Sequence, residues 1–494
     1  MSSQSLKSAL VRNRVACIAA LVHWLLTFGL ERLILESSAS AHPFDYTLCK
    51  LLLLPLLFGF WHLLVRGVTR KGFERSVLLH ALPYFAVLIA WLGLFHPFVL
   101  EADELNIFQR AVKLDSFAWW FNYPTGYYWI MGLMLLPHYM GPVFLKLLLQ
   151  ALVAGYCIAR QKWLTGRNAW LLYLLFCLPF VLDLGISAHR LPTYGILYLF
   201  LIAKLLYDHL EHRTLNCRTL VLLSALIGLL AVWRTEGIYL VPLGPILIFV
   251  SYRVKPNKIL WKQLLIYGLV LIAIAVPQFK CYLFDSDLST SLRTKPLCGY
   301  ALCNMFRNGL TEDMISDERA DIEGYLRIET IHQYNEIYGD TNYSSALIMD
   351  GTENADYPTQ ERFCSAVKQV ILKHPLIYAK SQWNAWRYTS NQYTADFSGG
   401  LDGIARGLTA LTSKVCFPSM LVLLFCFLAL IRRKWLLFWI TGCGAANWVL
   451  VTALMPAAYA KYFYVNYLMG YFLLLVGLCF LLRRKGRTRE HPSV

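Results

Sequence analysis

Long apolar stretches dominate this chain and constrain its fold more than any other feature. Most run for about 16 to 24 residues, and a helix that crosses roughly 30 Å of hydrocarbon needs about 20. Only 15% of the residues are charged and 57% are hydrophobic, whereas a soluble protein carries about 25% charge. The sequence therefore predicts an all-α polytopic membrane protein. It excludes secreted, fibrous, disordered and disulfide-framework chains.

We expect about 12 transmembrane helices, one for each apolar stretch. The predicted spans are Val15–Ile34, Tyr46–Val65, Val77–Leu100, Pro142–Ile158, Ala169–Ile186, Thr193–Tyr207, Leu220–Trp233, Gly237–Val250, Leu260–Pro277, Val415–Ile431, Trp435–Leu454 and Tyr462–Leu482. A further apolar segment, Gly126–Met140, is predicted to be interfacial or re-entrant. Counting it as a span would place the basic cluster Arg160–Arg167 outside, against the usual charge bias.

The Lys and Arg residues are distributed unevenly around these spans. With the N-terminus inside, the inner loops hold 25 of them and the short outer loops hold six. Cytoplasmic loops of membrane proteins are enriched in this way. The net charge of +16 therefore indicates topology and not nucleic-acid binding. We expect both termini in the cytoplasm, an uncleaved N-terminal signal anchor, and a location in the plasma (inner) membrane, or in the endoplasmic reticulum membrane of a eukaryote.

The chain divides into three predicted parts. Residues 1–277 form a membrane module that contains spans one to nine and a first outer loop, 101–141. Residues 278–412 carry 17 acidic and 12 basic residues and are expected to form a small, mainly helical outer domain, with a helix break at His374-Pro375. Residues 413–494 hold spans ten to twelve and a basic cytoplasmic tail.

Four of the 13 cysteines fall in the predicted outer domain. They are Cys281, Cys298, Cys303 and Cys364. An oxidising outer compartment would allow two disulfides, and spacing leaves all three connectivities open. A zinc site is disfavoured because the four residues include no CxxC pair.

The first outer loop opens with the acidic run Glu101-Ala102-Asp103-Glu104. A carboxylate near hydrocarbon and headgroups is a stronger base than one in bulk water. Asp103 is therefore our candidate general base, with Glu104 in reserve, and Glu104 could instead hold a metal ion. The alternative is a solvated acidic turn that caps the following helix.

Two short outer turns carry cations that could bind a phosphate. One turn holds His189 and Arg190, six residues after Asp183. Arg can grip a phosphate with two hydrogen bonds, and His can donate to or protonate a leaving oxygen. The alternative is that these side chains anchor a helix end among the lipid headgroups.

The second turn, Trp233–Gly237, places Arg234 beside Glu236 at membrane depth, where charges are costly unless paired or functional. We expect Arg234 to bind a phosphate while Glu236 orients it. A purely structural ion pair of Arg234 with Glu236 or with Asp183 is the alternative. Lys461, in the last outer turn, could add a further phosphate contact, although its aromatic neighbours suit an interfacial belt.

Aromatic side chains gather near the end of the predicted outer domain. Trp383, Trp386 and Tyr388 could stack on sugar rings or anchor a helix at the headgroups. The sequence contains no Walker loop, GxGxxG box, HExxH motif or nucleophile elbow. Nucleotide cofactors are therefore not expected, and we predict no metal.

Ala102-Asp103-Glu104, with Phe108-Gln109 and the later Pro124–Tyr128 segment, resembles the first outer loop of the GT-C superfamily of integral-membrane glycosyltransferases. The acidic pair is similar to the His-Pro-Asp-Glu box of lipid-linked mannosyltransferases, with Glu101-Ala102 in place of His-Pro. In that superfamily this loop carries the catalytic Asp. The resemblance implies transfer of a sugar from a polyprenyl-phosphate donor to a glycan, glycolipid or protein acceptor at the outer face.

Two other functions remain open from the sequence. A polysaccharide ligase or polymerase would depend on Arg and His and not on Asp103. A flippase or transporter of lipid-linked sugars would use charges along a central path and broken helices in two related halves. The few charges in the middle of predicted spans are chiefly Lys50 and Lys146.

Overall fold

The computed structural model describes the greater part of the chain. The described residues are 3–35, 42–70, 72–95, 102–114, 122–254, 258–284, 286–338, 356–389, 414–455 and 459–482. Of these, only the backbone is described for 3–12, 95, 102–103, 167, 258–259, 279–284, 286–296 and 337–338.

Within these ranges the chain forms helices and no strand, as expected of an all-α membrane protein. The helices of the bundle are α1 (Ser3–Leu30), α2 (Pro43–Thr69), α3 (Phe73–Phe95), α6 (Gly141–Thr165), α7 (Leu172–Phe176), α8 (Pro179–Ile186), α9 (Arg190–Leu210), α10 (Cys217–Trp233), α11 (Leu240–Ser251), α12 (Lys258–Phe284), α20 (Cys416–Ile431), α21 (Trp435–Leu454) and α22 (Tyr464–Leu481). The first outer loop contributes α4 (Ala102–Val112) and α5 (Tyr123–Leu135). The outer domain contributes α13 (Ser286–Arg307), η5 (Glu312–Ile315), α14 (Arg319–Glu323), α15 (Ile328–Tyr338), α17 (Tyr357–Lys373) and α18 (Pro375–Thr389). Single 3-10 turns are η1 (Glu31–Leu33), η3 (Gly166–Leu171), η4 (Thr235–Tyr239) and η6 (Ala460–Phe463).

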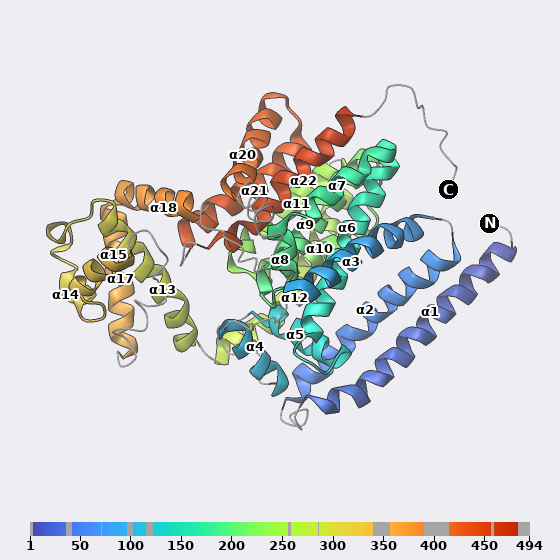
Figure 1. Ribbon diagram of the computed structural model, residues 1–494, viewed down its shortest axis with the longest axis horizontal. Coiled ribbons are helices and arrows are strands. Elements are labelled where there is room, and N and C mark those ends of the chain that lie inside the picture. The colour runs from blue at the N-terminus through green and yellow to red at the C-terminus, as the bar shows by residue number, and fades with distance from the viewer. Residues whose placement is uncertain are drawn as a thin grey trace.

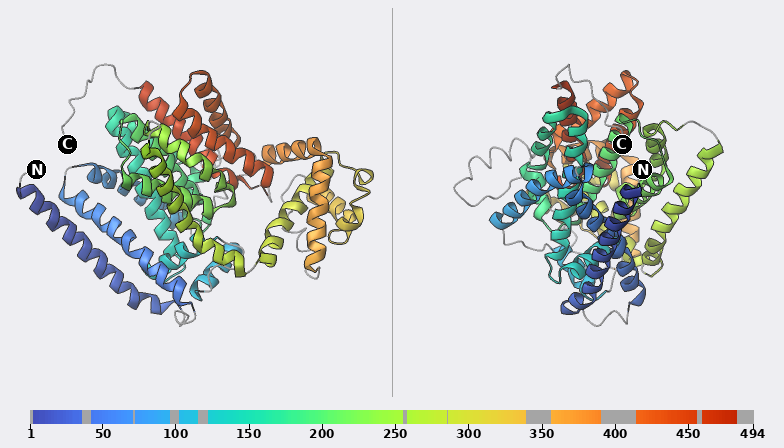
Figure 2. Two further views of the ribbon diagram at one scale, coloured as in Figure 1. Left: turned by 180° about the vertical axis from the view of Figure 1, so that it is seen from behind. Right: turned by 90° about the vertical axis from the view of Figure 1, so that its right-hand side faces the viewer.

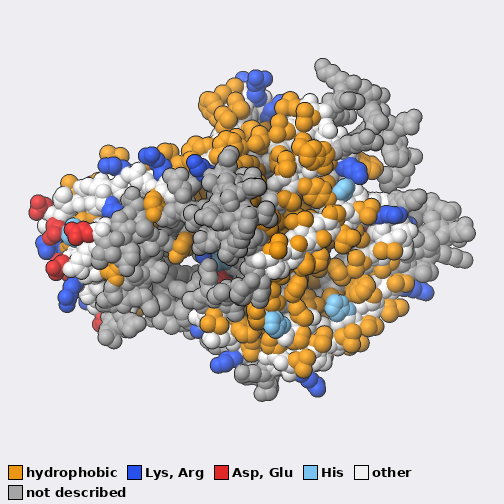
Figure 3. Space-filling view, in the orientation of Figure 1, with side chains coloured by type: hydrophobic (Ala, Val, Ile, Leu, Met, Phe, Trp, Pro, Cys, Tyr) orange, Lys and Arg blue, Asp and Glu red, His pale blue; other side chains and the backbone are white. Residues whose placement is uncertain are grey.

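Eight of the described helices are long and apolar enough to cross a membrane, or nine if the bent pair α7–α8 counts as one span. Three shorter apolar helices, α10, α11 with its preceding η4, and α20, occupy three of the remaining predicted spans. Hydrophobic side chains cover much of the visible bundle, whereas the acidic side chains gather on the outer domain (Figure 3). A membrane-embedded helical fold is thus confirmed, while the count of twelve crossings stays a prediction.

The outer domain projects from one end of the bundle (Figure 1, Figure 2). The N-terminal end of α1 and the C-terminal end of α22 both lie toward the other end. Which end faces the cytoplasm remains a prediction from the charge bias.

The predicted fifth span is broken in the middle. Its two halves are bent by 57° between Phe176 and Pro179. Leu178 is extended and Pro179 is the first residue of α8. Proline lacks an amide hydrogen and disfavours a helical residue before it, so α7 cannot continue through this point. The axis of α8 therefore runs in a different direction from that of α7.

The segment predicted to be interfacial or re-entrant, Gly126–Met140, overlaps α5, a helix of 13 residues that begins at Tyr123 and ends at Leu135. This is shorter than the roughly 20 residues that a span requires. It is largely buried and packs against α2, α4, α6 and α10. Tyr127 on α5 donates to Asp45 on α2 over 2.9 Å. The first outer loop is therefore anchored within the bundle.

Close packing between α3 and α6 depends on Gly155. A Cβ atom at this position would lie 2.4 Å from the carbonyl oxygen of Val77 and 2.8 Å from Cβ of Ala81. Small residues allow such close approach of helix backbones in membranes. Among the eight long helices, α9 has the largest buried share and lies at the centre of the bundle. The smallest buried share is that of α12.

Buried ion pairs connect helix ends on both sides of the bundle. Lys50 on α2 lies 2.5 Å from Glu31 in η1 and also donates to Thr27 of α1. At the other end, Arg160 of α6 lies 2.5 Å from Glu211, just after α9. Charges in such places are rarely left unpaired because hydrocarbon does not solvate them.

The outer domain has its own apolar core, formed chiefly by α13, α15 and α17. As predicted, the helix breaks at His374, and α18 begins at Pro375. The helix α12 continues past Pro277 as far as Phe284, so the predicted boundary between residues 277 and 278 falls inside a helix. On the far side, α18 joins α21, where Tyr378 and Gln382 both donate to the carbonyl of Ala453.

We predict that Gly155→Ala lowers the thermal stability of the bundle. The added methyl group must push α3 away from α6, and overpacking of this kind costs about 1–3 kcal/mol. The measurement is the midpoint of thermal unfolding in detergent. Gly268→Ala on α12 is the matched control, because nothing lies within 4 Å of its added Cβ. Equal midpoints for the two variants would contradict the packing described here.

Candidate active site

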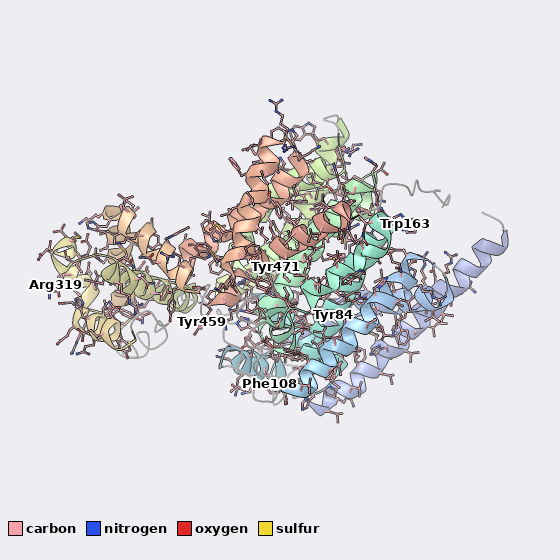
Figure 4. All side chains as sticks on the ribbon, turned by 45° about the horizontal axis from the view of Figure 1, so that its top comes forward. Tyr84, Phe108, Trp163, Arg319, Tyr459 and Tyr471 are labelled. Atoms are coloured by element: carbon pink, nitrogen blue, oxygen red, sulfur yellow. The ribbon has the colours of Figure 1, made fainter. Side chains whose placement is uncertain are left out.

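Seven charged or titratable side chains meet at the end of the bundle that carries the outer domain. They come from α4, α6, the start of α9, the η4 turn and η6. We call this group the Glu104 cluster: Glu104, Lys146, His189, Arg190, Arg234, Glu236 and Lys461. In Figure 4, Phe108 of α4 and Tyr459, just before η6, lie toward the outer domain, whereas Trp163 near the end of α6 lies at the opposite end.

Glu104 lies in the first turn of α4 and is 1% exposed. One of its carboxylate oxygens, Oε1, is 3.7 Å from Nε2 of His189. The carboxylate also interacts electrostatically with the ammonium group of Lys146. The first outer loop, 101–141, is thus connected to α6 and to the turn before α9.

The hydrogen bonds of His189 determine its tautomer. The backbone amide of Leu191 donates to Nδ1 of His189 over 3.1 Å, so the imidazole caps the first turn of α9. A nitrogen that accepts a hydrogen bond carries no proton. The neutral ring therefore carries its hydrogen on Nε2, the nitrogen that faces Glu104.

Charge on His189 is strongly disfavoured. Burial lowers the pKa of the imidazole well below its usual range, and the nearby cations Lys461, Arg190, Arg234 and Lys146 lower it further. His189 is consequently neutral near pH 7 and can donate a hydrogen bond from Nε2. Its role toward a leaving oxygen stays a prediction.

Lys146 is the residue of the cluster to which sequence reasoning gave no role. It lies in the second turn of α6 and is 2% exposed. Its ammonium group donates to the carbonyl oxygen of Leu184 over 3.1 Å and to that of Ser187. These carbonyls lie at the C-terminal end of α8, where the helix dipole is negative and favours a cation. The one signal in the sequence was a charge within an apolar stretch.

Arg234 and Glu236 form an ion pair, a contact expected both if Glu236 orients a phosphate-binding Arg234 and if the pair is purely structural. Arg234 Nε donates to Glu236 Oε1 over 2.8 Å, and Arg234 Nη2 contacts the same oxygen. The guanidinium carbon lies 5.8 Å from the centre of the Tyr462 ring. The alternative partner, Asp183, instead accepts a hydrogen bond from Trp91 Nε1 over 2.7 Å.

Two further cations complete the cluster. Arg190 is the first residue of α9 and is partly buried. Lys461 in η6 lies with its ammonium nitrogen 4.8 Å from the centre of the Tyr459 ring. Both interact electrostatically with His189. Positions that are far apart in sequence thus bring four cations around one imidazole.

The side chain of Asp103, the predicted base, lies outside the described residues, although its backbone belongs to the first turn of α4. The three predicted sugar-stacking residues are on α18. Trp386 is 1% exposed and packs against Trp383 and Trp448, so it connects the outer domain to α21. Trp383 remains 44% exposed and Tyr388 is half-buried, and a stacking role stays a prediction for these two.

Within the described part of the chain, no group of three or more His, Cys, Asp or Glu side chains is placed to hold a metal ion. Chemically, the cluster combines a buried carboxylate, a neutral hydrogen-bond donor and an excess of positive charge. Such a site suits an anionic ligand that carries a phosphate.

Comparison with protein-family models, with curated proteins and with solved structures finds no match for this chain.

The pKa of His189 predicts how stability depends on pH. Because the folded state binds this proton less readily than the unfolded state, stability falls as pH drops below about 6.5, by up to about 1.4 kcal/mol per pH unit for this one group. His189→Asn, whose side-chain oxygen can still cap α9, should lose less stability over this range than wild type. Thermal midpoints between about pH 8 and about pH 5 measure the difference. Parallel curves for the two proteins would show that His189 does not remain neutral.

Proposed function

We propose that this chain is an inverting glycosyltransferase that moves a sugar from a polyprenyl-phosphate donor to a glycan, glycolipid or protein acceptor on the outer face of the membrane. The Glu104 cluster carries the proposal. It places an acidic helix beside four cations at one end of an apolar bundle. This combination suits a reaction that takes a proton from an acceptor and leaves negative charge on a lipid-bound phosphate.

In the proposed topology the chain crosses the membrane twelve times. The eight long helices, the bent pair α7–α8 and the three shorter apolar helices account for these crossings. Both termini and the basic loops face the cytoplasm, while the Glu104 cluster and the outer domain share the outer side. The membrane is the plasma (inner) membrane, or the endoplasmic reticulum membrane in a eukaryote.

The two acidic residues of α4 have different proposed roles. Asp103 accepts the proton of the acceptor hydroxyl as that oxygen attacks the anomeric carbon. Glu104 is buried against His189 and Lys146, and this environment suits a carboxylate that keeps the cations in place. A positioned base contributes about 10²–10⁴-fold to such a reaction.

The cations act on the leaving group. As the bond between the anomeric carbon and the phosphate oxygen breaks, the phosphodiester becomes a phosphomonoester with one more negative charge. Arg234, Arg190 and Lys461 stabilise that charge, and His189 donates a hydrogen bond from Nε2. Direct displacement by the acceptor inverts the anomeric centre. No nucleotide is required, because the donor already carries the activated phosphate.

Two alternatives each have one observation in their favour. A polysaccharide ligase or polymerase would use Arg190, Arg234 and His189, which the structure brings together, and would not need Asp103. A flippase or transporter of lipid-linked sugars would use broken helices near its binding site, and the bent pair α7–α8 ends beside Lys146.

We predict that Asp103→Asn lowers kcat for transfer by about 10²–10⁴-fold, while donor binding is retained. The assay follows label from a polyprenyl-phosphate-linked sugar into cell-envelope acceptors. Asp313→Asn in the outer domain is the matched control, because this aspartate is exposed, and it should leave transfer unchanged. Full transfer by Asp103→Asn would favour Glu104 as the base or the ligase reaction. Donor binding without transfer by wild type would favour the transporter.

We also predict that Arg234→Lys weakens donor binding and lowers kcat by about 10²–10³-fold, the usual cost of removing one preorganised donor. Lysine keeps the charge but cannot make paired hydrogen bonds to a phosphate. Arg319→Lys, at an exposed site of the outer domain, is the control. Wild-type kinetics for Arg234→Lys, with the protein still monodisperse, would assign Arg234 a structural role only.

A further inference from the structure

Cys298 on α13 and Cys364 on α17 lie against each other in the core of the outer domain, and the proposed reaction uses neither. Each is 6% exposed. Cys298 Sγ lies 3.9 Å from the backbone oxygen of Cys364, and the two side chains are in hydrogen-bonding contact. A disulfide requires neighbouring side chains and not a particular spacing in sequence, so this contact distinguishes among the pairings that the sequence left open.

Helix geometry excludes one of the other pairings. Cys303 follows Cys298 by five residues on the same helix. At about 1.5 Å per residue their Cα atoms are about 7.5 Å apart along the axis alone, which is beyond the roughly 7 Å that a disulfide can bridge. Cys303 therefore cannot pair with Cys298 while α13 is intact. The side chain of Cys281 lies outside the described residues.

We propose that Cys298 and Cys364 are joined by a disulfide that connects α13 to α17. The two thiols lose two protons and two electrons as the S–S bond forms. The disulfide of an exported thiol oxidoreductase accepts them and becomes a dithiol. The proposal rests on the outer orientation that the proposed function assigns to this domain, because disulfides persist in oxidising compartments and are rare in the cytoplasm.

The bond would matter because the outer core is small. Small extracytoplasmic domains commonly supplement a limited apolar core with disulfides. The two residues are 66 positions apart, and a bond that closes a loop of this length removes much of the conformational freedom of the unfolded domain.

Burial also dictates when the bond forms. The hydrogen bond to Cys364 and burial raise the pKa of the Cys298 thiol. A thiol in such a place is seldom a thiolate and reacts slowly. Oxidation therefore precedes the final packing of α13 on α17, and the finished bond is protected from reductants.

The test is peptide mapping of the full-length protein. Free thiols are blocked with N-ethylmaleimide in the denatured protein, which is then digested and analysed by mass spectrometry with and without prior reduction. We expect the Cys298 and Cys364 peptides to be linked until reduction. Cys303→Ser should keep the link, and Cys364→Ser should leave Cys298 free to react with the maleimide. Alkylation of both residues without reduction, or a link between Cys364 and Cys303, would overturn the proposal.

A second measurement tests the orientation of the outer domain independently of the disulfide. Glu329→Cys places an exposed thiol on the outer domain and Arg432→Cys places one in a predicted inner loop. Labelling of Glu329→Cys by a membrane-impermeant maleimide in intact cells, with free thiols at Cys298 and Cys364, would overturn the disulfide and leave the orientation standing. Labelling of Arg432→Cys but not of Glu329→Cys would overturn the outer orientation and, with it, the proposed disulfide.

Discussion

The ammonium group of Lys146 connects the parts of the molecule on which the candidate site depends. It comes from α6, donates hydrogen bonds to two carbonyl oxygens at the end of α8, and interacts with Glu104 of the first outer loop. A lysine inside an apolar bundle is costly unless its charge is satisfied by protein groups. The chain satisfies it with the carbonyls of Leu184 and Ser187, at the point where α8 ends. The end of α8 and the buried cation therefore stabilise one another.

Much of the fold could be predicted because it follows from solvation. A stretch long enough to cross hydrocarbon must be helical, since every backbone polar group needs a partner within the same segment. Details that depend on contacts between residues far apart in the sequence could not be predicted. The continuation of α12 through Pro277 and the burial of Trp386 between Trp383 and Trp448 both depend on contacts made elsewhere in the chain.

In the candidate site, too, local contacts could be predicted from the sequence and contacts between distant residues could not. Arg234 and Glu236 are two residues apart, so a contact between them could be expected from local sequence, although the sequence left Asp183 open as another partner of Arg234. By contrast, the pairing of Asp183 with Trp91 joins residues 92 positions apart, and no local signal announces it. The tautomer of His189 depends on where α9 begins. Because the helix begins at Arg190, the amide of Leu191 has no partner within the helix and donates to Nδ1 of His189. Side-chain chemistry was visible in the sequence, whereas the proton positions needed the structure.

The outer domain and the bundle each have an apolar core, and the two cores share none of the described residues, although Tyr300 of α13 and Trp386 of α18 belong to the core of the bundle. A chain with two apolar cores need not unfold in one cooperative step. No single free energy of unfolding then applies to the molecule. A chemical change confined to α17, none of whose described residues belongs to the core of the bundle, would alter the persistence of the outer domain first.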